Sequence, residues 1–344
     1  MPNWDDPLAF WGQGTWDSPS APPPLSPPKT KKHNTRTMSS NATPDNNDIL
    51  RALADRIADG CHQHEVALNI KQNTEAAIRA AIAGLAQSEL QVGLKKAAVS
   101  GAFDALQTVD ADGETVLIAC KLRLQQKLGQ RWSAAWEPTG FPSQSTAVPK
   151  LADERFTLLD SLKDYFTAVP ANESVDMGAT AAICLAAWTA LSNARQAVAN
   201  AESAQTTAFS NRTTAENALR KRVRGLINEL EGGLLADDDA RWEDFGLNIP
   251  ANPSAPESVA SVTLAPASAN RLEVSWPYAV RAIRYIIEIF IVGLDTEWRT
   301  GANSKDLTVI LKGFTAGQTV KVRVVSANDG GNAAPSPEGQ AVIV

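Results

Sequence analysis

The sequence between Ser174 and Gly232 repeats small or apolar residues at steps of mostly three and four, the spacing of one helix face. The repeating residues are Ala187, Leu191, Ala194, Val198, Ala201, Ala208, Ala215, Leu219, Val223, Leu226 and Leu230. Gln205 and Arg212 occupy two further positions of the same face. A helix of about 59 residues is close to 90 Å long at 1.5 Å per residue, so it needs packing partners along its length.

Alanine is the commonest residue on this face, and it buries little apolar area per residue. Small side chains also let two helix backbones approach each other closely. We therefore predict an elongated antiparallel helical bundle in which a first long helix pairs with this one. A shallow contact gains from burial of a second face between copies, which favours a homo-oligomer.

The same periodicity predicts three further helices upstream. They cover about 48–106, 115–132 and 151–168. The first is expected to be long, with any break near Gly60 or Gly93, and the polar run Asp110–Glu114 is expected to be a turn. Residues 136–142 are expected to form a loop with apolar anchors, and Pro170 to end the third helix.

The composition changes after Gly232 and Gly233, with prolines at 250, 253 and 256. Short strand-like runs then recur at 259–264, 271–276, 283–291, 307–311, 320–326 and 341–344. Some alternate with a period of two, as Val320, Val322 and Val324 do with the charged residues between them. This alternation predicts strands with one buried face and one face in water.

Certain residues in this segment have the order and spacing of a known family. They are Pro253, Pro256, Leu272, Val274, Trp276, Tyr285, Leu311, Gly313, Phe314, Ala316, Gly317, Val322, Val324, Ala327, Asn328, Pro335 and Ser336. Over about a quarter of the chain they resemble a fibronectin type III domain, which implies a β-sandwich. Val320 stands where the family usually has a corner tyrosine, so a hydrogen bond worth about 1 kcal/mol is expected to be absent.

Long helices followed by one such domain also resemble a group of bacterial proteins of uncharacterised function, known only as fibronectin type III domain-containing. The heptapeptide RWEDFGL, Arg241–Leu247, is part of this resemblance. The resemblance implies no activity. In bacteria such domains commonly serve as spacers or adhesive units, often outside the cell.

The N-terminal 47 residues combine aromatic side chains with a proline-rich run over 19–28, which favours an extended spacer. Trp4, Phe10, Trp11 and Trp16 are interaction candidates, because exposed indole rings gain little unless they dock. We interpret the segment as a docking arm for a partner's groove, another copy of the chain or the protein's own helices. Two alternatives stay open: an arm folded back on its own domain, and a true start at Met38.

The formal net charge of −6 gives no cationic field to collect phosphates, so no nucleic-acid partner is expected. Cys61, Cys120 and Cys184 are an odd, widely spaced set, which favours buried free thiols. No run reaches the roughly 18 apolar residues that span a bilayer, so no membrane insertion is expected. The N-terminus lacks signal-peptide features, which favours a cytoplasmic protein and leaves non-Sec export or attachment to a particle open.

Two local motifs are weak signals for a metal site. Cys61–Glu65 places ligand types on one helix face, but no second pair stands near it in sequence, which favours a solvated helix segment. Asp110–Glu114 mimics the start of a calcium loop, yet its sixth position is Thr115 and its twelfth is Lys121. Without these, and without a phosphate-binding glycine loop or a nucleophile context for the three histidines, we expect no metal, no cofactor and no enzyme activity.

We predict a multidomain α plus all-β chain. Its parts are a docking arm at 1–47, an elongated four-helix bundle at 48–235, a linker at 236–255 and a fibronectin type III-like domain at 256–344. The expected function is structural or scaffolding, through self-assembly or docking of protein partners. The alternative is a ligand- or glycan-binding adhesion module, carried by sandwich loops that contain Trp298 and Arg299 or Asp329–Asn332.

Overall fold

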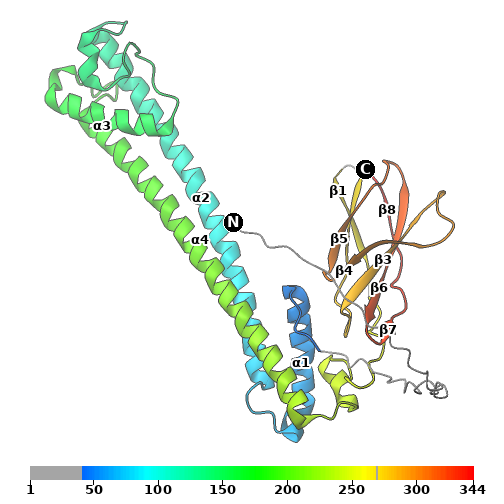
Figure 1. Cartoon of the computed structure of the whole chain (residues 1–344). Helices are drawn as coiled ribbons and strands as arrows, with labels where there is room; N and C mark the ends of the chain where they lie inside the picture. The colour runs from blue at the N-terminus through cyan, green and yellow to red at the C-terminus, as the bar shows by residue number, and fades with distance from the viewer. Residues whose placement is uncertain (1–40, 269) are drawn as a thin grey trace, which may run out of the picture. The chain divides into compact units, whose positions relative to one another are not determined.

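The computed structural model describes residues 41–268 and 270–344, and Figure 1 shows how their helices and strands are arranged. The α-helices are α1 (Asn47–Leu68), α2 (Glu75–Leu128), α3 (Ala152–Ala168) and α4 (Ala181–Glu229). Antiparallel sheets follow them in the chain. The predicted fold class, a helical region followed by an antiparallel β-sandwich, is confirmed.

A short break separates α1 from α2, and it lies where the sequence analysis did not expect it. Asn69 ends α1 in the left-handed conformation at φ 56°, which asparagine adopts more readily than most residues. Thr74 starts α2, and its Oγ1 accepts a hydrogen bond from the N–H of Ala77 at 3.3 Å. The predicted break near Gly60 or Gly93 is wrong, because both glycines lie inside helices.

α2 also continues through Asp110–Glu114, so the turn predicted there is wrong. The run contains no proline to stop the helix. Gly113 is buried, and a Cβ added to it would lie 3.4 Å from Cδ1 of Leu159 on α3. Asp110 of α2 pairs with Arg155, which also lies on α3. These polar and small residues therefore mark a contact between helices and not a reversal of the chain.

α2 and α4 pack side by side and run antiparallel (Figure 1). At one end, the Sγ atoms of Cys120 on α2 and Cys184 on α4 lie 3.5 Å apart. At the other end, Arg222 of α4 donates a 2.9 Å hydrogen bond to the carbonyl of Gln72, just before α2. The predicted antiparallel pairing is confirmed by these two contacts. We call the α2–α4 pair the arm, its cysteine end the tip and its other end the base.

On each helix of the arm, a series of residues at steps of seven faces the other helix. On α2 these residues are Ile78, Leu85, Val92, Val99, Leu106, Gly113 and Cys120. On α4 they are Cys184, Leu191, Val198, Gln205, Arg212, Leu219 and Leu226. The cysteine contact fixes the register, which sets Val99 beside Gln205 and Val92 beside Arg212. The middle of the arm therefore has polar side chains in its contact, whereas both ends are mainly apolar.

Two hydrophobic clusters hold the ends of the arm. The base cluster joins α1 to both arm helices through residues such as Leu50, Ile57, Leu85 and Leu219. The tip cluster joins α3 to the arm through residues such as Leu117, Leu159, Phe166 and Leu191. Between the clusters the arm helices bury only Val92, Val198 and Ala208, all within the described residues. The middle of the arm thus has little core of its own.

The connections at the tip agree in part with the sequence. α3 closely matches the predicted helix at 151–168. The segment predicted as a loop at 136–142 instead begins in a short 3-10 helix, η1 (Ala134–Thr139). Its expected apolar anchors are confirmed, since Trp136 and Phe141 are buried with their ring centres 5.4 Å apart. α4 begins later than predicted because Ser174 and Ala179 pair as a β-bridge before it.

The C-terminal segment is a sandwich of two antiparallel sheets. Its strands are β1 (Thr263–Ser268), β2 (Arg271–Ser275), β3 (Arg284–Ile291), β4 (Arg299–Ser304), β5 (Thr308–Lys312), β6 (Thr319–Asn328), β7 (Gly331–Asn332) and β8 (Gly339–Val342). One sheet has the order β1-β2-β5, and the other has β4-β3-β6-β7 with β8 paired to β6. This architecture is shared by immunoglobulin and fibronectin type III domains.

The predicted alternation is confirmed in β6, where Val320, Val322 and Val324 are buried in the sandwich core. β4 was not predicted, because its sequence RTGANS has no apolar alternation and forms the outer edge of its sheet. Val320 supplies no hydroxyl at the corner, as expected from its side chain. The hydroxyl of Tyr285 instead accepts a 3.2 Å hydrogen bond from the N–H of Ala279, within the same core.

Removing a buried leucine from the base cluster should destabilise the helical region. Leu219→Ala is expected to lower the free energy of unfolding by about 2–5 kcal/mol, because it deletes methyl groups from a closed core. Leu185→Ala on the same helix is the matched control, since Leu185 is 47% exposed and should cost less than about 1 kcal/mol. Urea unfolding followed by circular dichroism measures both. Equal losses would contradict the assignment of the core.

Candidate functional site

The segment between α4 and the sandwich contains the heptapeptide Arg241–Leu247 that contributed to the sequence resemblance. It forms a short 3-10 helix, η4 (Ala240–Phe245). Trp242 and Phe245 are fully buried in the base cluster, and Trp242 Nε1 donates a 2.9 Å hydrogen bond to the carbonyl of Ala236. η4 is therefore anchored on the helical region by two aromatic side chains.

Gly60 explains why η4 can lie so close to α1. A Cβ added to Gly60 would stand 2.5 Å from Cδ1 of Phe245 and 2.9 Å from the carbonyl oxygen of Asp244. A side chain there would have to displace the aromatic ring. The glycine that resembled a helix breaker in the sequence is thus a docking position for η4.

The acidic residues of the heptapeptide reach in two directions. Asp244 Oδ2 lies 2.8 Å from Nε2 of His64 on α1. Glu243 pairs with Arg281 of the sandwich, and it accepts a 2.6 Å hydrogen bond from the hydroxyl of Ser254. Neighbouring carboxylates therefore connect the same short helix to α1 and to the sandwich.

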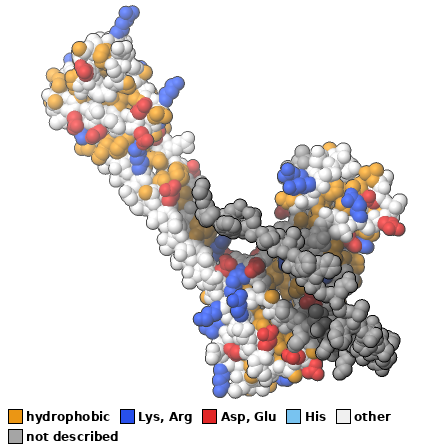
Figure 2. Space-filling view, in the orientation of Figure 1, with side chains coloured by type: hydrophobic (Ala, Val, Ile, Leu, Met, Phe, Trp, Pro, Cys, Tyr) orange, Lys and Arg blue, Asp and Glu red, His pale blue; other side chains and the backbone are white. Residues whose placement is uncertain are grey.

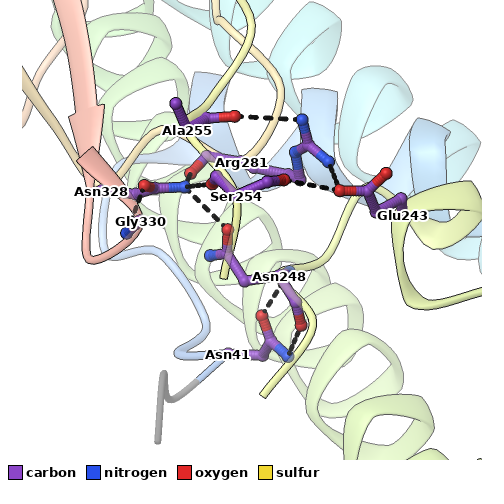
Figure 3. A network of polar contacts seen from close by, with 8 residues as sticks. All are labelled: Asn41, Glu243, Asn248, Ser254, Ala255, Arg281, Asn328 and Gly330. Carbon is purple, nitrogen blue, oxygen red and sulfur yellow. Dashed lines mark hydrogen bonds and ion pairs between the residues drawn. The ribbon is translucent and has the colours of Figure 1, made fainter. Parts of the chain in front are cut away.

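Asparagine side chains continue this network (Figure 3). Asn41 pairs with the backbone of Asn248 in both directions, at 2.9 Å and 3.0 Å. The side-chain oxygen of Asn248 accepts a 2.8 Å hydrogen bond from Nδ2 of Asn328, at the end of β6. Asn248 is 4% exposed and Asn328 is 2% exposed, so these bonds are shielded from water. We call the network of Asn41, Glu243, Asn248, Ser254, Arg281 and Asn328 the junction.

Asn328 is the most connected residue of the junction. Its Nδ2 also lies within hydrogen-bonding distance of the carbonyl oxygens of Ser254, at 2.9 Å, and Arg281, at 3.2 Å. Its Oδ1 accepts a 2.8 Å hydrogen bond from the N–H of Gly330 (Figure 3). One buried amide therefore contacts backbone groups from three separate segments, and unpaired groups of this kind are costly.

The loop Asp329–Asn332, one candidate for ligand binding, takes part in the junction. A Cβ added to Gly330 would lie 2.5 Å from backbone atoms of Pro253 and Ser254. The close backbone contact leaves no space at this position for a side chain. The loop is thus held in place by its contact with Pro253 and Ser254, which precede the first strand of the sandwich.

The other candidate residues of the sandwich, Trp298 and Arg299, lie at the start of β4. The Trp298 ring lies 4.3 Å from the guanidinium of Arg323 and 5.8 Å from the Phe290 ring. Arg299 pairs with Asp295 at 3.3 Å. Both candidates therefore have contacts within the sandwich. Trp4, Phe10, Trp11 and Trp16 lie outside the described residues.

The side chains of Cys61–Glu65 do not converge on one point. The Cys61 thiol is buried and donates to the carbonyl of Asn73 at 3.6 Å, whereas His62 pairs with Glu75. His64 turns to η4, as described above. Burial raises the pKa of the Cys61 thiol to about 12, which keeps it protonated at neutral pH. In residues 41–268 and 270–344 no group of three metal-ligating side chains occurs.

A charged cleft of about 480 Å³ lies beside the junction and is lined by Arg56, Asp59, His62, Glu75, Arg79 and Glu243 among others. Its charges largely pair with one another: Arg79 bonds Asp59 at 3.0 Å and Glu75 at 2.8 Å. Hydrogen bonds from Arg79 and His62 lower the pKa of Glu75. The ion pairs of Arg79 in this cleft therefore join α1 to α2 electrostatically.

The surface of the arm is unusually apolar. Figure 2 shows hydrophobic side chains on the surface of the arm and its tip. The large exposed ones are Leu90, Leu94, Phe103, Ile118 and Leu122 on α2, and Leu185 and Phe209 on α4. Apolar surface on a helix usually faces a partner. The sequence favoured burial of a second face between copies, but it did not identify the residues of that face, because the steps of three and four were assigned to a single contact.

No helix in the described ranges has an apolar stretch long enough to cross a bilayer. No protein-family model matches the chain. No curated protein matches it either.

Solved structures that match contain fibronectin type III domains. One is the titin kinase with its flanking domains, at 16% identity over 26% of this chain and 17% of that chain, with a TM-score of 0.24. The FN5 domain of Drosophila Lar matches at 16% identity over 26% of this chain and 96% of that one, with a TM-score of 0.23. The sixth domain of human fibronectin type III domain containing protein 3 matches at 19% identity over 27% and 89%, with a TM-score of 0.24.

The junction should fail when its central amide is removed. Asn328→Ala is expected to cost about 1–3 kcal/mol, because it leaves buried carbonyl groups unpaired. It should also speed proteolytic cleavage between Asn248 and Ala255. Asn332→Ala, an exposed asparagine a few residues on, is the control and should change neither property. Identical cleavage rates in both variants would contradict this role of Asn328.

The three thiols should be unreactive in the folded protein. Cys61, Cys120 and Cys184 are all free and buried, and the hydrogen bond to Cys184, together with burial, raises the pKa of Cys120. Maleimide is expected to label none of them during the time in which it labels all three in urea, since only an exposed thiolate reacts. Mass spectrometry counts the labels. Rapid labelling of the folded chain would contradict the burial.

Proposed function

We propose that this protein is a non-enzymatic structural or scaffolding protein that presents its sandwich on a helical arm. It assembles with copies of itself or docks protein partners through its helical faces and its tryptophan-rich N-terminal segment. The observation that carries this proposal is the junction. Buried asparagines and the Glu243–Arg281 pair tie the sandwich to η4, which is anchored in the base cluster. A structural protein that holds its sandwich in a fixed position needs a connection of this kind. It does not need a catalytic cleft.

The exposed apolar side chains of the arm support the assembly part of the proposal. Four large aliphatic side chains of α2 are between 45% and 56% exposed: Leu90, Leu94, Ile118 and Leu122. Removing such groups from water contributes about 25 cal/mol per Å² of apolar area, part of which offsets the entropy lost on association. The N-terminal Trp4, Phe10, Trp11 and Trp16 supply further docking groups in this proposal.

Light scattering tests self-assembly directly. The full chain and a version without residues 1–38 are measured across a range of concentrations. We expect an oligomer for the full chain, and the truncated version reports whether the N-terminal segment contributes. Two monomers would rule out self-assembly.

A second candidate function is ligand or glycan binding by the sandwich. The turn between β3 and β4 favours it, because Val292 is 48% exposed and Leu294 is 66% exposed beside Trp298. A glycan array probed with the full chain and with Trp298→Ala tests it. Binding that persists in the variant would exclude Trp298 as the contact residue.

A further inference from the structure

A second stripe of residues runs along the outer face of α2, away from α4. Its members alternate steps of four and three: Leu90, Leu94, Ala97, Gly101, Asp104, Thr108, Ala111, Thr115, Ile118 and Leu122. All ten are exposed, and Asp104 is the one charged residue among them. A solvated helix face normally carries many more charges. We call these residues the α2 stripe.

The α2 stripe has a two-fold pattern about Leu106. Leu90 and Leu122 each lie sixteen residues from Leu106, and Leu94 and Ile118 each lie twelve residues from it. The apolar pairs therefore stand at equal distances on either side, with small residues between them. A symmetric dimer requires such a face, because residue i must fit residue j and j must fit i.

An antiparallel arrangement of two stripes matches this pattern. Leu94 of one copy then packs on Ile118 of the other, and Leu90 packs on Leu122. Gly101 faces Ala111, so the backbones can approach closely at that level. Large side chains thus meet at both ends of the contact and small ones meet near its centre.

Charge favours the antiparallel arrangement over the parallel one. In a parallel pair Asp104 would face its own copy, and two carboxylates in one seam repel each other. In the antiparallel pair Asp104 lies beside Thr108, an uncharged residue whose hydroxyl donates to the backbone carbonyl of Asp104 in its own helix at 3.0 Å. Among flanking charges, Asp112 meets Ser100 and no like charges face each other.

The middle of the arm is also the part of it that a partner would stabilise most. Val92, Val198 and Ala208 are its buried side chains between the two clusters, and Gln205 and Arg212 lie in its contact. Two helices with so small a core are marginal on their own, since helices in proteins depend on packing of an apolar face. A second copy on the outer face of α2 would give that helix a second packed face, with the four helices lying side by side in the order α4, α2, α2, α4.

The available area fits a weak dimer. From Leu90 to Leu122 the stripe is about 50 Å long at 1.5 Å per residue, and a helix is about 10 Å wide. The contact would therefore bury on the order of 1,000 Å² in total, the lower limit for a specific interface. Dissociation in the micromolar range is expected.

We infer that the α2 stripe is the dimerisation surface of this protein and that its partner is a second, antiparallel copy of the same stripe. The inference rests on the proposed self-assembly and names its surface and orientation. Each substitution in such an interface acts twice, because each residue occurs in two symmetric contacts.

Charge variants of the full chain test the surface by sedimentation velocity. Leu94→Glu should weaken the dimer at least about a hundredfold, because each change places a carboxylate against Ile118. Adding Ile118→Lys to the same chain should restore at least a tenfold part of the loss, because opposite charges then face each other across the dimer. The control is Leu185→Glu, because Leu185 is a leucine of α4 outside the stripe that is 47% exposed, against 54% for Leu94; it should leave the dissociation constant unchanged.

Cysteine pairing tests the orientation. Ala97 and Thr115 face each other only across an antiparallel dimer, since on one helix they are about 27 Å apart at 1.5 Å per residue. A mixture of Ala97→Cys and Thr115→Cys chains should give a disulfide-linked dimer under mild oxidation by oxidised glutathione, with far less from either chain alone. The native thiols are buried and should not interfere.

The possible outcomes distinguish a failure of this inference from a failure of the proposed self-assembly. A wild-type oligomer that persists in Leu94→Glu would overturn the stripe while self-assembly stands. Cross-linking of Ala97→Cys chains alone would show a parallel pair and would overturn the orientation. A wild-type chain that stays monomeric at all concentrations would overturn both. A dimer that forms only after residues 1–38 are removed would identify the N-terminal segment as the occupant and would also overturn the inference.

Discussion

The pairing of α2 with α4 along residues at steps of seven is the constraint on which the rest of the helical region depends. It fixes the register through Cys120 and Cys184, and it places Gln205 and Arg212 in the middle of the contact. A long contact with polar and small side chains at its centre cannot supply much burial there. The stability of the arm must therefore come from its ends, where α1 and α3 add the two clusters.

Because the stability of the arm comes from its ends, the junction lies beside the base cluster. The base cluster is the hydrophobic core that lies next to η4. This short helix inserts Trp242 and Phe245 into it. The polar side chains on the same short helix are then held in place, so Glu243 can reach Arg281. A buried asparagine network adds specificity, because each amide must find its partners or lose about 1–3 kcal/mol. Apolar anchoring and polar orientation thus act on one heptapeptide.

The sequence was informative where one periodicity dominates and misleading where two features compete. Heptad spacing predicted the antiparallel pairing, and alternation in Val320, Val322 and Val324 predicted a strand of the sandwich. Asp110–Glu114 resembled a turn because acidic residues and glycine are common in turns. Their real partners, Arg155 and Leu159, lie on another helix and cannot be read from local sequence. The junction was invisible for the same reason, since Asn248 and Asn328 are distant in the chain.

The α2 stripe shows what the same periodicity can hide. A long helix has two faces with steps of three and four, and a pattern assigned to one contact conceals a second. Only the observed burial separates them: Leu85 is fully buried against α4, whereas Leu90 is 56% exposed on the opposite side. Selection for solubility alone would place charges at such positions. Alanine, glycine and leucine at these positions, arranged symmetrically about Leu106, are better explained by a surface shaped for a second copy.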